Sequence, residues 1–458
     1  MKRDAKLLEL EQKPMGRLLW QYSLPAIIGM AAMSIYNIVD AIYIGRFCGA
    51  YAMAGMAIVF PLVNLTVAFG TLIGLGSAAN ASIALGQGDM NRAYRVLGHC
   101  VVLGLLGGVL LAALCIPFLR PLLLFFGATA DTLQPAYDFM LVTMLGFPLS
   151  SSFMNLNHLM RASGYPAKAM VSLLISMLVN IAAAHLFIYE WEWGMTGAGL
   201  ATVAAQGVGI LWVGAHYLRR RSVLHLRRGI YKLSKPIMLR IMAVGLPPCL
   251  LNAVGCVIVV LFNGLLLRYE GDMGVGAFGV VNRIVFFFVM VVLGITQGMQ
   301  PIAGYNLGLG NYRRVRSVFF RALMASSLVM LAGWLLIQGM PRVLVGAFVN
   351  VQDADSARLA DLAVRGMRLL TIFFPLVATQ VVVGNFFQAI GRPVMSIILN
   401  LTRQLIVLVP ALLLLPPRLG DAGIWLSQSV ADFVSSLLAA VVVYLFFTRV
   451  FRRSSRPL

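Results

Sequence analysis

LGQGDMNR, at residues 85–92, recurs 222 positions later as LGLGNYRR, at residues 307–314. A second match, at a nearly equal offset, is FPL at 147–149 with FPL at 374–376. The small drift between the two offsets is what short loop insertions produce. Because the matches keep their order along the chain, we predict two homologous halves that share one fold.

The composition predicts a membrane protein. Of the 458 residues, 60 % are hydrophobic and 11 % are charged, and the mean hydropathy is +0.88. Soluble domains contain about 25 % charged residues. Apolar runs long enough to cross a bilayer as helices recur along the whole chain. We therefore expect an all-α membrane protein with twelve transmembrane helices, at residues 16–44, 52–83, 93–118, 134–160, 168–189, 197–218, 236–267, 274–305, 317–340, 366–390, 393–415 and 422–447.

The formal net charge of +20 is compatible with a nucleic-acid partner, but the placement of the charge is not. With these spans, most of the 36 Lys and Arg residues fall on the side that holds both termini. Cytoplasmic loops carry such an excess, so we expect both termini in the cytoplasm and no nucleic-acid partner. The basic loop RRRSVLHLRRGIYKLSK, at 219–235, is expected to touch anionic membrane lipids.

Each predicted half has six spans, so both halves share one orientation in the membrane. We expect an N-lobe at 1–218, a basic cytoplasmic linker at 219–235 and a C-lobe at 236–458. Halves related by an axis along the membrane normal are typical of transporters in which one bundle rocks against the other around a central site. A pseudo-symmetric monomer suits this mechanism, and a monomer is what we expect.

Several motifs in both halves resemble one transporter family: YNIVDAIYIG at 36–45, LGQGDMNRAYRV at 85–96, RASGYP at 161–166, GMTGAGLATVAAQ at 194–206 and QGMQPIAGYNLGLGNYRRV at 297–315. The sequence resembles the bacterial branch of the MATE (multidrug and toxic compound extrusion) transporters along nearly its whole length. The resemblance implies two pseudo-symmetric six-helix lobes around a central cleft. It also implies export of amphipathic, often cationic drugs or metabolites in exchange for H⁺ or Na⁺. The expected location is the bacterial cytoplasmic (inner) membrane.

Asp40 lies inside the first predicted span. An ionised aspartate at the bilayer centre costs about 2.5–3.5 kcal/mol on insertion scales, and such residues usually face the bundle interior. Tyr36 and Asn37 precede it by four and three residues and project from the same helix face. We predict that Asp40 binds and releases the coupling ion. The alternative is that it only joins helices by hydrogen bonds.

In the family that this chain resembles, the cation site adds an Asn and a second Asp on helix 5 and a Thr on helix 6. The Asn and Thr correspond to Asn180 and Thr202, but Ala184 occupies the second Asp position. Na⁺ needs several oxygen ligands and a proton needs one carboxylate, so this departure favours H⁺ over Na⁺. The neighbouring His185 is either a second proton site or a hydrogen-bonded histidine at a helix end.

The last span of the C-lobe carries a polar stripe that includes Gln428 and Asp432. Within a span, such a stripe faces protein or a water-filled cavity. Arg283, beside Asn282, and Arg403 are the intramembrane cations available to pair with Asp432. Pairing would make Asp432 structural, and the alternative is a role in substrate binding.

Substrate contacts are expected from flexible, aromatic or amide side chains in spans that border the cleft. Helix packing is the alternative for each of them. The candidates are Met33, Asn64, Gln206, Gln297, Gln300 and Phe287.

Two other functional classes are alternatives to drug export. A lipid-linked oligosaccharide flippase of the same two-lobe superfamily would need a cationic cleft, for which Arg283 and Arg403 are the candidates. A membrane-embedded enzyme is disfavoured, because the sequence has no metalloprotease, serine-hydrolase or phosphate-loop motif. The five cysteines predict neither a disulfide framework nor a metal site. We therefore expect no enzymatic activity, no cofactor and no metal.

Overall fold

The computed structural model describes residues 5–349 and 354–454, and the regular secondary structure of this part of the chain is all helical, without strands. Eleven of its helices are long and apolar enough to cross a membrane, or twelve if one bent pair is a single span. The predicted all-α membrane fold is confirmed. The terminal residues 1–4 and 455–458, which the orientation prediction assigned to the cytoplasm, lie outside the described residues.

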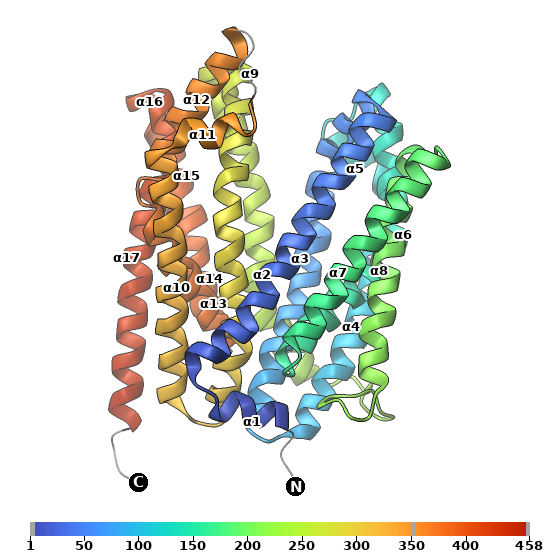
Figure 1. Cartoon of the computed structure of the whole chain (residues 1–458), viewed down its shortest axis with the longest axis vertical. Coiled ribbons are helices and arrows are strands. Elements are labelled where there is room, and N and C mark those ends of the chain that lie inside the picture. Colours follow the sequence, from blue (N-terminus) through green and yellow to red (C-terminus); the bar gives the residue numbers. More distant parts are fainter. Residues whose placement is uncertain (1–4, 350–353, 455–458) are drawn as a thin grey trace.

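The first half of the chain forms one bundle of six long helices (Figure 1). They are α2 (Met15–Tyr43), α3 (Ala50–Gly86), α4 (Met90–Cys115), α6 (Ala130–Ala162), α7 (Pro166–Ala184) and α8 (Gly194–Leu218). Shorter elements are α1 (Ala5–Gln12), α5 (Leu119–Phe125), the 3₁₀ turn η2 (Ile116–Phe118) and the π-helical turns η1 (Ile44–Cys48) and η3 (His185–Glu190).

The second half forms a second bundle. Its elements are α9 (Lys235–Gly308), α10 (Tyr312–Gly339), α11 (Pro341–Gly346), α12 (Ala354–Leu370), α13 (Phe374–Ala389), α14 (Pro393–Leu401), the π-helical η4 (Thr402–Leu408), α15 (Val409–Leu414), α16 (Pro416–Leu419) and α17 (Asp421–Ser454). α9 is two spans joined at Gly271, whose φ is 69°. The matching residue of the first half, Gly49, has a φ of 87° before α3. Both positions need glycine, because other residues rarely adopt positive φ.

The repeated motif makes the same helix junction in both halves. Gly88 and Gly310 have φ values of 74° and 73°. The next residues, Asp89 and Asn311, begin α4 and α10, and each side chain accepts a hydrogen bond from the backbone N–H three residues on, at 3.0 and 3.2 Å. A glycine that ends one helix and an Asp or Asn that caps the next explain why this pattern recurs.

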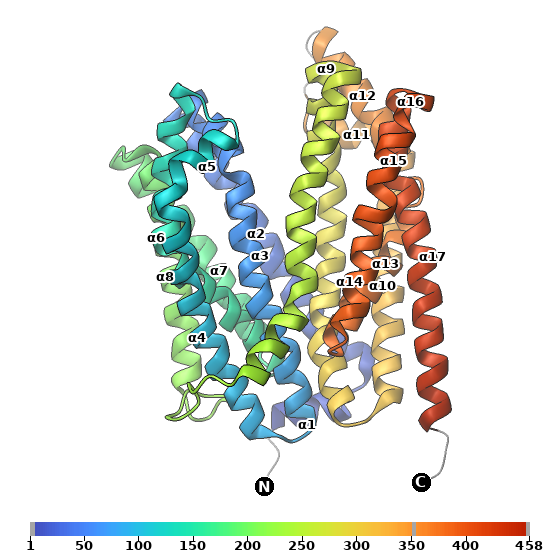
Figure 2. The ribbon, with the colours of Figure 1, turned by 180° about the vertical axis from the view of Figure 1, so that it is seen from behind.

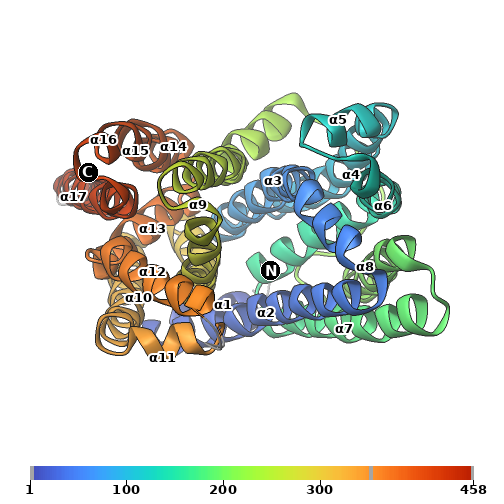
Figure 3. The ribbon, with the colours of Figure 1, turned by 90° about the horizontal axis from the view of Figure 1, so that it is seen from above.

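The two bundles approach each other at the end that carries α1 and the last turns of α17, and diverge toward the other end (Figures 1 and 2). Seen from above, α10 to α17 lie on one side and α3 to α8 on the other (Figure 3). Glycines of α3 and α9 meet backbone across the contact: Gly86 lies against Tyr305 and Gly308, and Gly245 lies against Leu72. A Cβ atom at Gly86 would overlap the Tyr305 carbonyl oxygen. Small residues of this kind let helix backbones pack closely in membranes.

The tenth span differs from the continuous helix expected at 366–390. The chain breaks between α12 and α13, which meet at 58°. Pro375, near the start of α13, lacks a backbone N–H and disfavours a helical residue before it. The Ser429 hydroxyl on α17 donates to the carbonyls of Leu369 and Leu370, at 2.6 and 2.8 Å. Because these carbonyls lie at the end of α12, the hydrogen bonds supply donors that a continuous helix would have provided.

Candidate functional site

A largely apolar cavity with a volume of about 400 Å³ lies inside the first bundle. Its walls come from α2, α3, α6, α7 and α8, and Gln297 of α9 closes it from the second bundle. The lining includes seven methionines and two phenylalanines: Met30, Met33, Met53, Met56, Met140, Met144, Met154, Phe139 and Phe147. Flexible thioethers and rings can adapt to apolar ligands of different shapes.

Asp40 lies in the wall of this cavity, and its side chain is buried. Its Oδ1 atom has no hydrogen-bond partner among the described residues, and the same holds for both amide atoms of the buried Asn180. Asn180 on α7 and Thr202 on α8 are nevertheless the side chains that interact with the carboxylate. Asp40 therefore faces polar side chains from two other helices and forms no ion pair among the described residues.

Tyr36 and Asn37 were predicted to share a helix face with Asp40. Tyr36 lines the Asp40 cavity and also a smaller cavity. Asn180 and Thr202 line this smaller cavity too. The Asn37 side chain is exposed and donates from Nδ2 to the Met33 carbonyl at 2.9 Å. It lines the cavity but is engaged with its own helix.

The helix that carries Asn180 brings Ala184 to a fully buried position, one turn further on. His185 is the next residue and begins η3 with a half-exposed side chain. Its Nδ1 lies 3.2 Å from the Tyr43 hydroxyl, and its Nε2 lies 3.6 Å from Oε1 of Glu190. His185 is not among the residues that line the Asp40 cavity, so the fold does not bring the two together.

The carboxylate of the second bundle has a different environment. Oδ1 of the buried Asp432 accepts hydrogen bonds from Arg403 Nε at 2.8 Å and from Gln428 Nε2 at 3.1 Å. Nη2 of Arg403 is also 2.8 Å from it. Arg403 therefore supplies the ion pair, whereas Arg283 and its neighbour Asn282 have exposed side chains on α9. The Arg403–Asp432 pair matches the alternative in which pairing gives Asp432 a structural role.

The substrate candidates separate into three groups. Met33, Gln206 and Gln297 line the Asp40 cavity. Gln300 lines a small adjoining cavity and donates to Asn385 Oδ1 at 3.4 Å. Asn64 and Phe287 line neither cavity. The Asn64 amide donates to the Phe60 carbonyl of its own helix at 3.0 Å, and Phe287 is 64 % exposed on α9.

Arg161 is a cavity residue that sequence reasoning missed. It is buried, and its guanidinium contacts His158 Nδ1 at 2.8 Å and hydrogen-bonds to Gln297 of the other bundle. No carboxylate of the described chain forms an ion pair with it. The sequence prediction placed Arg161 in a loop after residue 160, but α6 continues to Ala162. Arg161 is the first residue of the RASGYP motif, and this position was the sequence signal that could have identified it.

Comparison with known proteins places these features in context. The family described as MatE matches residues 25–186 and 247–413. The chain is 23 % identical over 447 residues to multidrug export protein MepA of Staphylococcus aureus, covering 97 % of this chain and 96 % of MepA. It is 24 % identical over 443 residues to the Staphylococcus haemolyticus MepA, covering 96 % of each.

Two solved structures share the fold over nearly their whole length. One is a MOP superfamily transporter from Pyrococcus furiosus, described as having a binding pocket of reversed polarity that suggests a different function. It has a TM-score of 0.92 and 21 % identity, covering 98 % of this chain and 99 % of that one. The other is the outward-facing conformation of a multidrug resistance MATE family transporter of the MOP superfamily. Its TM-score is 0.91 at 22 % identity, covering 98 % and 100 %.

Proposed function

Because this chain belongs to the MatE family, we propose that it is a multidrug efflux transporter that exports amphipathic, often cationic compounds in exchange for protons. The printed names of its MepA relatives support export of several drugs. We further propose a monomer in the bacterial cytoplasmic membrane, with both termini cytoplasmic and with lobes at 1–218 and 236–458 joined by the basic linker.

The observation that carries the proposal is the Asp40 carboxylate, which is buried in the wall of an apolar cavity with Oδ1 unpartnered. A proton on Asp40 removes the negative charge that attracts a cationic substrate. Proton binding and substrate binding then oppose each other, which is the reciprocal coupling that an antiporter requires. Release of the proton on the other side of the membrane restores the charge.

The arrangement of the two bundles supports alternating access. They meet through the glycine contacts of α3 and α9 and diverge at the opposite end. We propose that these contacts separate when the bundles rock to the opposite state. Packing through small residues suits this role, because it brings backbones together without side chains that must interlock and disengage.

The choice of protons over Na⁺ rests on Ala184, which supplies no oxygen ligand one turn from Asn180. The first test is efflux of a fluorescent cationic dye from proteoliposomes, with H⁺ and Na⁺ gradients imposed separately. We expect the proton gradient to drive transport and the Na⁺ gradient to leave it at background. Transport driven by Na⁺ alone would overturn the choice of ion, and a dye moved by neither gradient would overturn the proposed cargo.

A second carboxylate at position 184 sharpens this test. Ala184→Asp adds an oxygen ligand near Asp40 and Asn180, so we expect a Na⁺ gradient to stimulate transport by the variant. Ala182→Asp is the matched control, because residue 182 is exposed and lies about 200° around the helix from Asn180. Equal Na⁺ stimulation in both variants would show that the site beside Asp40 is not responsible.

The flippase alternative is not supported by the two arginines on which it rested. It requires cationic side chains in the cleft, and the two candidates were Arg283 and Arg403. Arg403 is paired with Asp432, and Arg283 does not line the Asp40 cavity. Lipid-linked oligosaccharide transport is therefore not part of the proposal.

A further inference from the structure

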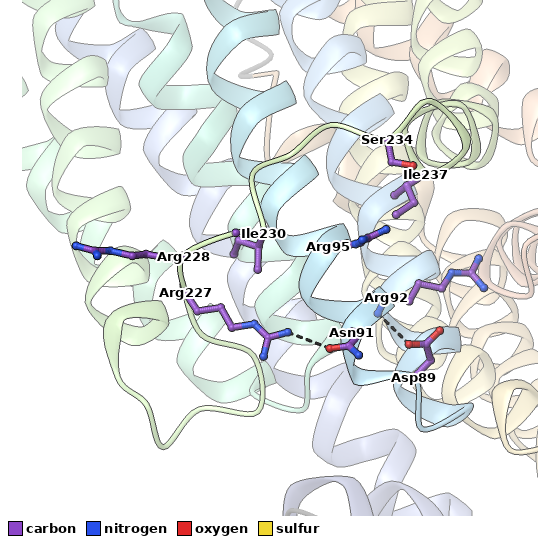
Figure 4. A pocket seen from close by; sticks show the side chains of 10 residues that line it. Asp89, Asn91, Arg92, Arg95, Arg227, Arg228, Ile230, Ser234 and Ile237 are labelled. Carbon is purple, nitrogen blue, oxygen red and sulfur yellow. Dashed lines mark hydrogen bonds between the residues drawn. The ribbon is translucent and has the colours of Figure 1, made fainter.

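A second large cavity lies outside the transport site, where the linker between the two bundles passes the first turns of α4 (Figure 4). Its volume is about 570 Å³. Four arginines contribute to its lining: Arg92 and Arg95 from α4, and Arg227 and Arg228 from the linker. Ile237, in the first turns of α9, completes the wall, so both bundles and the linker take part.

The charge in this cavity is largely uncompensated. Asp89 is the one acidic residue in its lining, and Oδ1 of Asp89 accepts the Arg92 backbone N–H as the helix cap of α4. None of the four guanidinium groups forms an ion pair with a carboxylate in residues 5–349 or 354–454. Arg92 also repels Arg240 at the start of α9. The cavity is therefore a concentrated positive site.

The walls of the cavity are fixed by specific contacts. The Arg227 guanidinium lies over the Tyr94 ring, 3.9 Å from the ring centre. Nη2 of Arg227 also donates a hydrogen bond to Asn91 Oδ1 at 3.1 Å (Figure 4). The Ser234 N–H donates to Nε2 of the buried His99 at 2.7 Å. The linker is thus held against α4 at two points, so the cavity exists before any ligand arrives.

We propose that this cavity binds a phosphate group, and that its natural source is the headgroup of an anionic phospholipid. Guanidinium groups match the geometry of phosphate oxygens and are favoured at such sites. The cavity lies at the first turns of two spans, α4 and α9, which is the headgroup level of a bilayer. Basic pockets between transmembrane helices bind phospholipid headgroups in this way.

A bound headgroup would connect α4 of the first bundle with the linker that leads into α9. The cavity is lined from both sides of this connection, and its volume admits a headgroup rather than a bare ion. A lipid at this place stabilises the arrangement of the two bundles. This role is independent of the substrate and of the coupling ion.

The test compares two double variants of the full-length protein that lose the same charge at the same end of the molecule. Arg92→Gln/Arg95→Gln removes two guanidinium groups from the cavity, and neither side chain forms a hydrogen bond within residues 5–349 and 354–454. Arg220→Gln/Arg221→Gln removes two exposed arginines of the same linker that do not line it. Lipid binding is measured by native mass spectrometry and by thermal unfolding in micelles with added phosphatidylglycerol or phosphatidylcholine.

We expect phosphatidylglycerol to bind and stabilise the wild type more than phosphatidylcholine does. Each basic residue at an anionic membrane surface contributes about a fivefold factor, so the cavity variant should bind about 30-fold more weakly. The linker variant should keep the wild-type affinity. Arg95→Gln alone, with an expected loss of about fivefold, keeps the test decisive if the double variant does not fold.

Inorganic phosphate, at an ionic strength matched with sodium chloride, distinguishes the two sources of the group. Stabilisation of the wild type but not of the cavity variant by inorganic phosphate would support the phosphate site and assign it to a soluble ligand. Equal responses to phosphatidylglycerol in the wild type and both double variants would overturn the proposal. So would equal binding of the anionic and zwitterionic lipids by the wild type.

Discussion

Each bundle buries an aspartate within its helices, and the two differ in what surrounds them. Asp432 receives three contacts of 2.8 to 3.1 Å from Arg403 and Gln428. Asp40 faces Asn180 and Thr202 with its Oδ1 unpartnered among the described residues. An aspartate paired with a cation joins neighbouring helices, whereas one without an ion pair can exchange a proton without breaking such a pair. The same residue type therefore suits structure in one bundle and coupling in the other.

The repeat sharpens this difference. At the offset of LGQGDMNR and LGLGNYRR, the position of Asp40 in the second half is Phe262, which is buried. The second bundle therefore has no carboxylate at the position that corresponds to Asp40. Two halves with one backbone plan carry different chemistry, and a transporter with one coupling site is the simplest outcome.

The largest effect is expected from Asp40→Asn. Without a titratable group, transport driven by a proton gradient should fall to background. The melting temperature should not fall, because Oδ1 loses no protein partner. Dye efflux from proteoliposomes and thermal unfolding measure the two quantities. Asp361→Asn, at an exposed carboxylate on α12, is the control and should transport normally. Undiminished proton-driven efflux by Asp40→Asn would remove the proposed contrast between the two carboxylates.

Arg403→Gln should act mainly on stability. It leaves Asp432 buried without its cation, and breaking a buried pair costs about 3–5 kcal/mol. Thermal unfolding in detergent measures the loss. Arg403→Met/Asp432→Leu removes both charges and should recover most of it. A single variant as stable as the wild type would show that the pair does not hold the second bundle together.

Ser429→Ala tests the break between α12 and α13. It removes the hydroxyl that donates to the Leu369 and Leu370 carbonyls, and leaving a buried acceptor without a partner costs about 1–3 kcal/mol. Ser427→Ala is the control on the same helix, because that hydroxyl bonds only to the Gly423 carbonyl of α17. Equal losses of melting temperature in the two variants would count against a role of Ser429 at the break.

Arg161→Gln should have the smallest effect. Arg161 bonds to Gln297, which contacts Met30, and Met30 lies ten residues before Asp40. Arg161 and Asp40 line the same cavity, and a guanidinium repels a cation about 15 Å away by about 1 kcal/mol at an effective dielectric constant of about 20. The variant should bind a cationic dye about fivefold more tightly and an uncharged one unchanged. Arg283→Gln, outside the cavity, should alter neither affinity, and a matching gain there would contradict the prediction.

The fold was readable from local patterns. Hydropathy gave the spans, and the repeat gave two halves, because a glycine with positive φ and a capping Asp or Asn act within a few residues. The site was readable in part. Asp40, Asn180 and Thr202 came from motifs, but Arg161 was missed because the end of α6 was placed before it. Phe287 and Asn64 do not line the Asp40 cavity, because the rotation of a helix depends on its neighbours.

The two FPL segments show where sequence stops being sufficient. Pro148 lies inside the continuous α6, whereas Pro375 follows a break. At the offset that aligns GAG at 197–199 with DAG at 421–423, the counterpart of Ser429 is Ala205, which has no hydroxyl to donate. The FPL segment is the same in both halves. A hydroxyl from a helix distant along the chain is available only at the break between α12 and α13.

The sequence by itself determined the membrane fold, the two halves, their junctions and the carboxylate at position 40, since these depend on composition and on residues close in the chain. Only the tertiary structure decided which carboxylate is paired, which span is broken and which arginines surround a cavity. Pairing, breaks and cavities depend on side chains that distant helices bring within hydrogen-bonding distance. Their energies are set by burial and partners, neither of which a local pattern contains.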